Sequence, residues 1–185
     1  MARTASRRLT YEDLLALPDD GLRHELIDGE HYVTPAPNLK HQAVVANLTA
    51  AIVPFMKRHD LGRLFTAPCD VVFSPSNVVE PDLLFVSRER LGLLTEQNVQ
   101  GAPDLVIEVL SPSTRKRDEG IKRQLYDRMG VREYWLVEPS FETIEVFRRI
   151  EGALRRVAEL AAESGDVLTT PLLPGLEIPV AEIFW

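Results

Sequence analysis

Apolar side chains recur at three- and four-residue steps in two long stretches of the chain, as in a helix that buries one face. The first stretch covers residues 41–57 and the second covers residues 115–129. In the second stretch, Ile121, Leu125 and Met129 form the predicted buried side. The pattern therefore predicts two amphipathic helices, each packed against another layer of the fold.

Strand-like patterns occupy most of the remaining chain. Asp28-Gly29 and Glu151-Gly152 each separate two alternating segments, which is typical of β-hairpins. The predicted elements besides the two long helices are a short helix over residues 11–17, hairpins over 23–33 and 143–160, and strands over 65–73, 78–86, 104–110 and 132–137. This order predicts an α/β or α+β fold with a mixed central β-sheet flanked by helices, an N-terminal hairpin and a C-terminal hairpin extension.

Length and composition limit the classes of protein that fit. The 185 residues, 45% of them hydrophobic, are enough for one domain over residues 1–185, with residues 1–10 expected as a flexible arm. No apolar run reaches the roughly 18–20 residues of a membrane span. The single cysteine, Cys69, excludes an intrachain disulfide, is expected as a small core residue, and favours a reducing cytoplasm. A net charge of −7 argues against a general nucleic-acid coat protein but not against an enzyme with a local basic surface.

One carboxylate stands inside the most apolar predicted strand. Glu108 lies among the aliphatic residues of the 104–110 segment, where an uncompensated charge would cost several kcal/mol. Asp82 opens another apolar strand, 26 positions earlier. Two carboxylates that meet across neighbouring strands supply the hard oxygen ligands that Mg²⁺ or Mn²⁺ prefers. The pattern thus predicts a divalent-metal site.

The order of several motifs resembles a known family. Pro81-Asp82, then Glu108, then a helix with Lys122 and Tyr126 is similar to the PD-(D/E)XK superfamily of restriction-endonuclease-like nucleases. Further segments, from Tyr11 nearly to the end of the chain, resemble the bacterial Uma-type family of that superfamily. These segments are Tyr11-Glu12-Asp13, His24 to Glu30, Pro103 to Thr114, and Gly130 to Pro139.

The resemblance implies Mg²⁺- or Mn²⁺-dependent hydrolysis of DNA phosphodiester bonds. Asp82, Glu108 and Glu25 would hold one or two ions, and with Lys122 they form the expected catalytic set. In the superfamily a lysine follows the glutamate by two positions, but here Leu110 stands there. The resemblance suggests that the lysine has moved to the next helix, where Lys122 matches, with Lys116 as the weaker substitute.

The DNA phosphate would be bound by side chains near the start of that helix. The expected substrate-binding residues are Tyr126, Ser111, Arg115 and Lys116, although Tyr126 can instead fix Lys122 by a hydrogen bond. A homodimer is expected as well, because nucleases that cut both strands often pair. The apolar segment 171–185 and the second hairpin are its candidate surfaces, although either can instead belong to the core.

Each assignment has a simpler alternative. Asp82 can cap a turn, Glu25 can be solvated, and Lys122 can be an exposed partner of Asp118. His41 fits a capping or surface residue, with contact to phosphate as the less favoured reading. For the whole chain, the alternatives to a DNA nuclease are a catalytically inactive binding or assembly module on the same fold, and a metal-dependent hydrolase of another phosphate ester. Carboxylates that point to opposite faces of the sheet would exclude the metal site.

Overall fold

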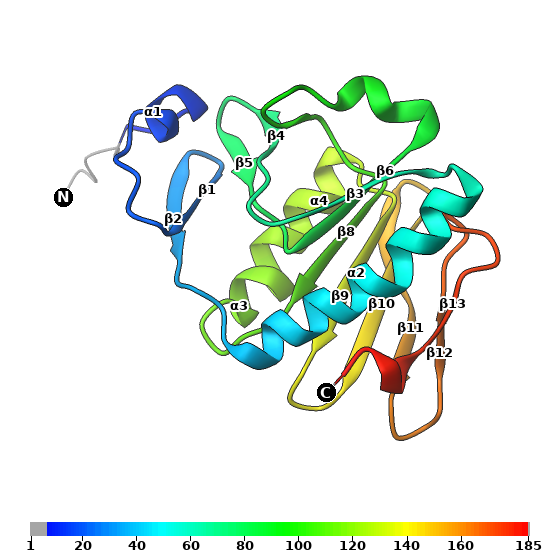
Figure 1. Ribbon diagram of the computed structural model, residues 1–185. Coiled ribbons are helices and arrows are strands. Elements are labelled where there is room, and N and C mark those ends of the chain that lie inside the picture. Colours follow the sequence, from blue (N-terminus) through cyan, green and yellow to red (C-terminus); the bar gives the residue numbers. More distant parts are fainter. Residues whose placement is uncertain (1–6, 185) are drawn as a thin grey trace.

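The computed structural model describes residues 7–184, which form two main β-sheets, a small two-stranded sheet and flanking helices (Figure 1). Most of the predicted flexible arm, residues 1–6, lies outside the described part of the chain. The rest of the arm is held in place, since Leu9 donates a backbone hydrogen bond to Gly29 and Thr10 caps the first helix. Within residues 7–184, no helix is long and apolar enough to cross a membrane.

The six-stranded sheet forms the centre of the molecule, with strand order β11-β10-β9-β8-β6-β3. These strands are β3 (Gly62–Thr66), β6 (Leu83–Ser87), β8 (Leu105–Val109), β9 (Glu133–Glu138), β10 (Thr143–Ile150) and β11 (Ala153–Ala161). Strands β8 and β9 are parallel and all other neighbours are antiparallel. The sheet is therefore mixed, as predicted, and β10 with β11 forms the predicted C-terminal hairpin.

The second sheet carries the N-terminal hairpin and has the strand order β2-β1-β5-β4-β7. Its strands are β1 (Arg23–Ile27), β2 (Glu30–Thr34), β4 (Val71–Ser74), β5 (Asn77–Val79) and β7 (Val99–Gln100). Positive φ angles at Asp28 and Gly29, 52° and 78°, are those of the predicted type I′ turn. Strands β12 (Val167–Thr169) and β13 (Glu177–Pro179) form the small sheet near the end of the chain.

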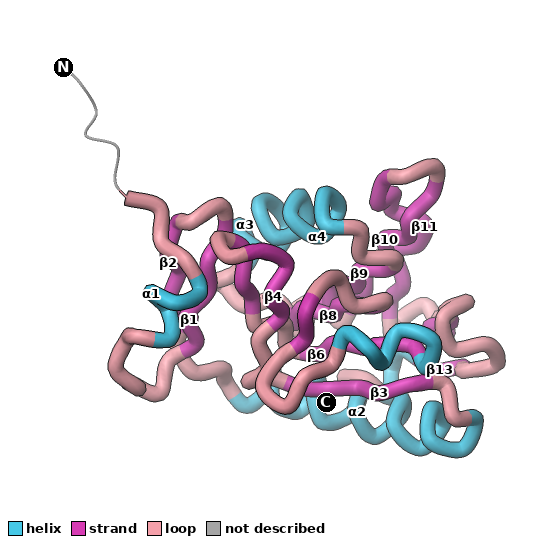
Figure 2. Tube along the Cα trace, turned by 90° about the horizontal axis from the view of Figure 1, so that it is seen from above, coloured by secondary structure: helices cyan, strands magenta, loops and turns pink. Residues whose placement is uncertain are grey.

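Helices cover both faces of the central sheet (Figure 2). Among the described residues, the helices are α1 (Tyr11–Leu15), which packs on the second sheet, and α2 (Leu39–His59), α3 (Arg115–Arg117) and α4 (Arg123–Met129), with a π-helical turn over Asp118–Lys122 and 3₁₀ turns over Arg88–Leu93 and Val180–Glu182. Helix α2 packs on one face, against the odd-numbered residues of β8, and α4 packs on the other face, against its even-numbered residues. Alternation along a strand sends successive side chains to opposite layers, so β8 is buried on both faces.

The two longest predicted strands are in fact four. The predicted strand over residues 65–73 divides into β3 and β4, and the one over 78–86 divides into β5 and β6. Each division contains a proline, Pro68 or Pro81, which has no N–H for the ladder. At both places the chain passes from one sheet to the other.

The buried side of the helix over residues 115–129 also differs from the prediction. Leu125 is buried, but Ile121 and Met129 are only partly so. The π-helical turn, which contains Gly120, interrupts the regular α-helix and places Asp118 and Lys122 on the buried side. Turns of this kind often occur at functional sites.

The closing segment belongs to the core. Leu173, Leu176, Ile183 and Phe184 are buried among the residues beneath α2, so the core alternative applies to these apolar side chains. Trp185, the last residue of that segment, lies outside the described residues. Cys69 is free and half-buried, packed at the edge of the cluster on the other face.

Candidate functional site

The register of β6 and β8 brings the two predicted carboxylates together. Leu83 pairs with Ile107 in this antiparallel ladder, so the next pair outward is Asp82 and Glu108. Both side chains therefore leave the same face of the sheet, the one that α4 covers. The arrangement that would have excluded a shared site, carboxylates on opposite faces, does not occur.

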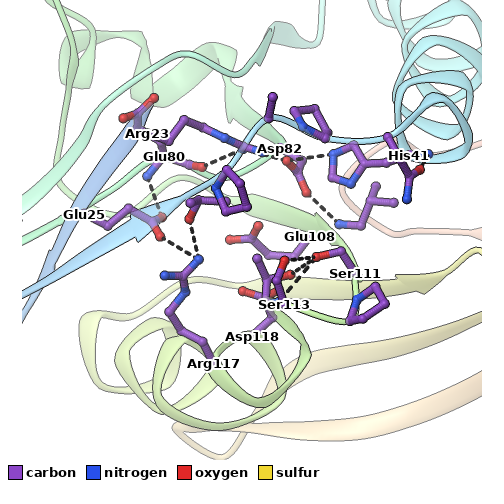
Figure 3. A pocket seen from close by; sticks show the side chains of 18 of the residues that line it. Arg23, Glu25, His41, Glu80, Asp82, Glu108, Ser111, Ser113, Arg117 and Asp118 are labelled. Atoms are coloured by element: carbon purple, nitrogen blue, oxygen red, sulfur yellow. Dashed lines mark hydrogen bonds and ion pairs between the residues drawn. The ribbon is translucent and has the colours of Figure 1, made fainter. Parts of the chain in front are cut away.

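Both carboxylates line a cavity of about 210 Å³ beside that end of the sheet. The segment 34–38, called here the proline strap, joins β2 to α2 and runs along the cavity. Figure 3 shows acidic and basic side chains intermixed around the cavity. The charged or titratable lining residues are Arg23, Glu25, His41, Glu80, Asp82, Glu108, Arg117, Asp118 and Lys122.

Lys122 occupies the centre of the acidic cluster. Its Nζ lies 2.8 Å from Glu108 Oε1 and 2.7 Å from Glu25 Oε1, with Asp118 Oδ1 at 3.8 Å. The lysine is 3% exposed, which excludes the solvated helical lysine that was the simpler alternative. Although burial acts to lower it, the carboxylates of Glu108, Glu25 and Asp118 raise the pKa of Lys122. The lysine is therefore held as a cation.

Tyr126 supports Glu108 and does not face the cavity. Its hydroxyl donates a hydrogen bond to Glu108 Oε1 at 2.6 Å, and the residue is 0% exposed. The expectation that Tyr126 binds substrate is therefore not supported, because its side chain is fully buried in this structure. Lys122 and Tyr126 lie four residues apart on the same side of the helix, so both reach the same oxygen.

Asp82 is held by two basic side chains and the backbone. Its Oδ1 accepts hydrogen bonds from Arg23 at 2.7 Å and from His41 Nε2 at 3.1 Å, and its Oδ2 accepts from the Val109 N–H at 2.8 Å. The backbone N–H of His41 donates to the side chain of Asn38, and Asn38, not His41, is the cap of α2. His41 is buried at the site, so the expectation of a surface residue is wrong.

Glu25 joins the site from the N-terminal hairpin. It is 1% exposed, which excludes the solvated alternative, and its Oε1 accepts the Glu80 N–H at 3.0 Å. Arg117 lies 3.6 Å from Glu25 Oε2 and donates a hydrogen bond to Thr34 of the proline strap. Arg117 thus connects the helix, the hairpin and the strap.

The environments of Asp82 and Glu108 shift their pKa values in opposite directions. Burial opposes ionisation of Asp82, but the hydrogen bond and charge of His41, together with Arg23, lower its pKa to about 2. For Glu108, burial dominates and the nearby acids Asp118, Asp82 and Glu25 add to it, so its pKa is raised although Lys122 acts to lower it. Asp82 therefore keeps its negative charge at neutral pH, whereas Glu108 takes up a proton more readily than a free glutamate does.

The oxygen atoms of the site suit a hard divalent cation. Glu25 Oε2 and Asp118 Oδ1 are buried and accept no hydrogen bond, so each has a lone pair to offer. Within residues 7–184, however, no three Asp, Glu, His or Cys side chains converge as ligands of one ion. Asp82 and Glu108 would then be the protein ligands, with water and substrate oxygens completing the shell, as Mg²⁺ commonly requires. Glu25 contacts Lys122 in this arrangement and does not complete a trio with Asp82 and Glu108.

The other predicted substrate-binding residues divide into two groups. Ser111 lines the cavity and shares hydrogen bonds with the hydroxyls of Ser113 and Thr114. Arg115 and Lys116 do not line the cavity. Arg115 pairs with Glu119 and Glu138, so the expectation that it binds substrate there is not supported, and Lys116 is exposed.

Sequence patterns did not assign four of the charged lining residues, Arg23, Glu80, Arg117 and Asp118, to the site. Arg23 lies two positions before Glu25, so strand alternation alone places it on the same side. Arg117 and Asp118 lie within the basic stretch at the start of the helix, where a regular helical period does not indicate which side chains turn inward. The π-helical turn decides that, and it left no signal beyond Gly120.

Comparison with known proteins agrees with this architecture. A solved structure, described as a putative nuclease belonging to DUF820 from Anabaena variabilis, matches with a TM-score of 0.80 and 22% sequence identity. The match covers 95% of this chain and 97% of that one, so the two proteins share a fold. No curated protein matches the chain. A family model for Uma2, described as putative restriction endonuclease, matches residues 11–181 and confirms the resemblance expected from the motifs. The chain therefore belongs to the Uma2 family.

Proposed function

We propose that this protein is a divalent-metal-dependent nuclease that hydrolyses phosphodiester bonds of DNA. The observation that carries the proposal is the buried cluster of Asp82, Glu108 and Lys122 on one cavity, in a chain of the Uma2 family. A catalytically inactive module on the same fold would gain nothing from burying these charges, because removing each ion from water costs several kcal/mol. The cluster is therefore more consistent with chemistry than with scaffolding.

Mg²⁺ or Mn²⁺, one or two ions, is the cofactor that the donor atoms fit. When bound, such an ion lowers the pKa of a water and stabilises charge on a phosphoryl oxygen. Asp82 is suited to hold it because its carboxylate is ionised and its orientation is fixed by Arg23, His41 and the Val109 N–H. Glu108 Oε1 is fixed in the same way by Lys122 and Tyr126.

Basic residues of the site would act on the phosphate. The Lys122 ammonium and the Arg117 guanidinium are fixed before substrate arrives, so they can stabilise the charge that builds on the phosphate without rearrangement. Ser111 and its neighbouring hydroxyls lie at the cavity wall, where they can donate to a phosphate oxygen. The proline strap limits the access of water to the acids.

Two further proposals concern partners and setting. A homodimer would place two such sites on one DNA molecule, and the hairpin β10–β11 remains a surface for it, with Ile150 and Val157 exposed. Cytoplasmic localisation is consistent with a single free cysteine. A hydrolase of a smaller phosphate ester would use the same charged groups, so only substrate tests separate it from a nuclease.

The test is cleavage of plasmid and single-stranded circular DNA by purified protein with Mg²⁺, with Mn²⁺ and with EDTA. Glu108→Gln keeps the shape of the side chain and removes its charge, so we expect cleavage to fall about 10²–10³-fold. Glu119→Gln is the matched control, since Glu119 is exposed and lies off the cavity. Metal-dependent cleavage that survives Glu108→Gln unchanged would show that the activity does not come from this site.

A further inference from the structure

A second cavity adjoins the first. It measures about 370 Å³, and eight residues line both cavities, including the wall formed by Arg23, His41, Glu80 and Asp82. In Figure 3 these four side chains lie along one side of the acidic cavity. The proline strap borders both spaces. A molecule bound at Asp82 can therefore extend from one cavity into the other.

The two cavities differ in size in a way that separates their ligands. Pockets for organic ligands usually measure about 300–1,000 Å³. The first cavity, at about 210 Å³, is below that range and suits a phosphate with ions and water. The second, at about 370 Å³, is within the range and is large enough for an organic group attached to that phosphate.

The walls of the second cavity have the chemistry of a nucleoside site. The side chains found only there are mostly apolar and include Leu22, Val45 and Pro68, which can cover the faces of a flat ring. Gln42, whose amide both donates and accepts, provides a partner for the polar edge of a base. Among these residues, Leu22, Gln42 and Pro68 are exposed in the free protein, so a ligand would cover them.

We propose that the second cavity binds the nucleoside next to the scissile phosphate, and that the preferred substrate is therefore single-stranded DNA. This inference rests on the proposed nuclease function and names its substrate more narrowly. A base whose faces are covered by the walls of this cavity cannot remain stacked and paired in a duplex, and extruding it costs a few kcal/mol. This cost is smallest for a single strand, whose bases are already unpaired, so a single strand binds more tightly than a duplex of the same length.

The experiment measures binding without cleavage, by fluorescence anisotropy with Ca²⁺ in place of Mg²⁺. The probes are a labelled single-stranded dT 12-mer, a 12-mer of abasic residues with the same phosphates, and a 12-base-pair duplex. We expect the dT strand to bind at least tenfold more tightly than either of the other two. The abasic strand isolates the contribution of the bases, because its backbone charge is unchanged.

A double variant localises that contribution. Leu22→Ala with Gln42→Ala removes exposed side chains of the second cavity and leaves the first intact, so we expect the ratio between dT and abasic strands to fall below about threefold. Ala46→Ser is the control, because Ala46 is exposed on the same helix but lines neither cavity. Thermal unfolding of each variant verifies that it is folded.

The outcomes separate the inference from the function on which it rests. Equal affinity of the wild type for dT and abasic strands, a ratio that the double variant leaves unchanged, or no binding of single strands would overturn the second-cavity site. Metal-dependent DNA cleavage together with any of these results would leave the nuclease proposal standing. Base-dependent binding without cleavage in Mg²⁺ or Mn²⁺ would instead refute the nuclease proposal while supporting the cavity as a nucleoside site.

Discussion

Replacing Lys122 by methionine tests the electrostatic balance of the site. The change keeps the length of the side chain and removes its charge, which lies 2.7 Å from Glu25 and 2.8 Å from Glu108. At an effective dielectric constant of about 20, each contact corresponds to roughly 6 kcal/mol of Coulomb attraction. Most of this repays the cost of removing the charges from water, so the net effect must be smaller.

The expected loss of stability follows from what the variant leaves behind. Removing one partner of a buried ion pair typically costs about 3–5 kcal/mol, because the remaining charge stays buried. Proton uptake by Glu108, whose pKa burial already raises, relieves part of the repulsion. We therefore expect urea unfolding at pH 7.5 to show a decrease of about 3–4 kcal/mol in the free energy of unfolding.

The same variant is expected to lose stability but to gain affinity for a divalent metal ion. With the lysine gone, Glu25 and Glu108 lack their cation, so Mn²⁺ should bind the variant more tightly than the wild type and restore part of the lost stability. Calorimetric titration with Mn²⁺ and unfolding with and without the ion measure both effects. Lys116→Met, at an exposed position off the cavity, is the control. Unfolding within 0.5 kcal/mol of the wild type, the ordinary range for surface changes, would refute the reasoning.

Three further changes examine other parts of the structure. Tyr126→Phe removes the 2.6 Å hydrogen bond to Glu108, so we expect urea unfolding to show a decrease of about 1–2 kcal/mol in the free energy of unfolding. Cleavage kinetics should show a lower kcat with an unchanged KM. A raised KM would mean that the tyrosine contacts substrate. Burial, then Asp70 and Glu25, raise the pKa of Glu80 to about 7, above the ordinary value of 4.5. Ionisation of Glu80 therefore destabilises the fold as the pH rises from about 4.5 to 7. We expect Glu80→Gln to stabilise the protein by about 1–2 kcal/mol at pH 8 and by little at pH 4, as measured by thermal unfolding. The same difference at both pH values would contradict the raised pKa. Gly62→Ala would place a Cβ 2.2 Å from the Val86 carbonyl oxygen, so we expect chemical unfolding to show a decrease of about 2 kcal/mol or more in the free energy of unfolding. For the control Gly130→Ala, whose Cβ would meet no atom of another element within 4 Å, we expect a decrease of about 1 kcal/mol. Equal decreases would contradict the close approach of β3 and β6.

Sequence patterns predicted much of the fold because burial repeats with a period. The hairpin turns, the long helix α2 and the doubly buried strand β8 each follow one regular pattern, and the structure confirms them. The division of two predicted strands at Pro68 and Pro81 was missed. Apolar residues continue past both prolines, and periodicity alone does not show that a chain has changed sheets.

The site was predicted in part for a related reason. Glu108 was evident because a carboxylate within an apolar run needs compensation, and Lys122 came from the resemblance to a family. Arg23 and His41 were not assigned to Asp82 because their contacts join residues 59 and 41 positions apart, which no local spacing specifies. The inward turn of Asp118 depends on a π-helical turn, which follows from packing more than from local sequence.

The register between β6 and β8 has a consequence for how this family can vary. A one-residue insertion in either strand would send Asp82 or Glu108 to the opposite layer, so both strands are expected to keep their length. The connection between them, residues 88–104, leaves the ladder and returns to it, and extra residues there cost little in loop entropy. Insertions are therefore tolerated far better in this connection than in either strand, because only the strands fix the spacing of Asp82 and Glu108.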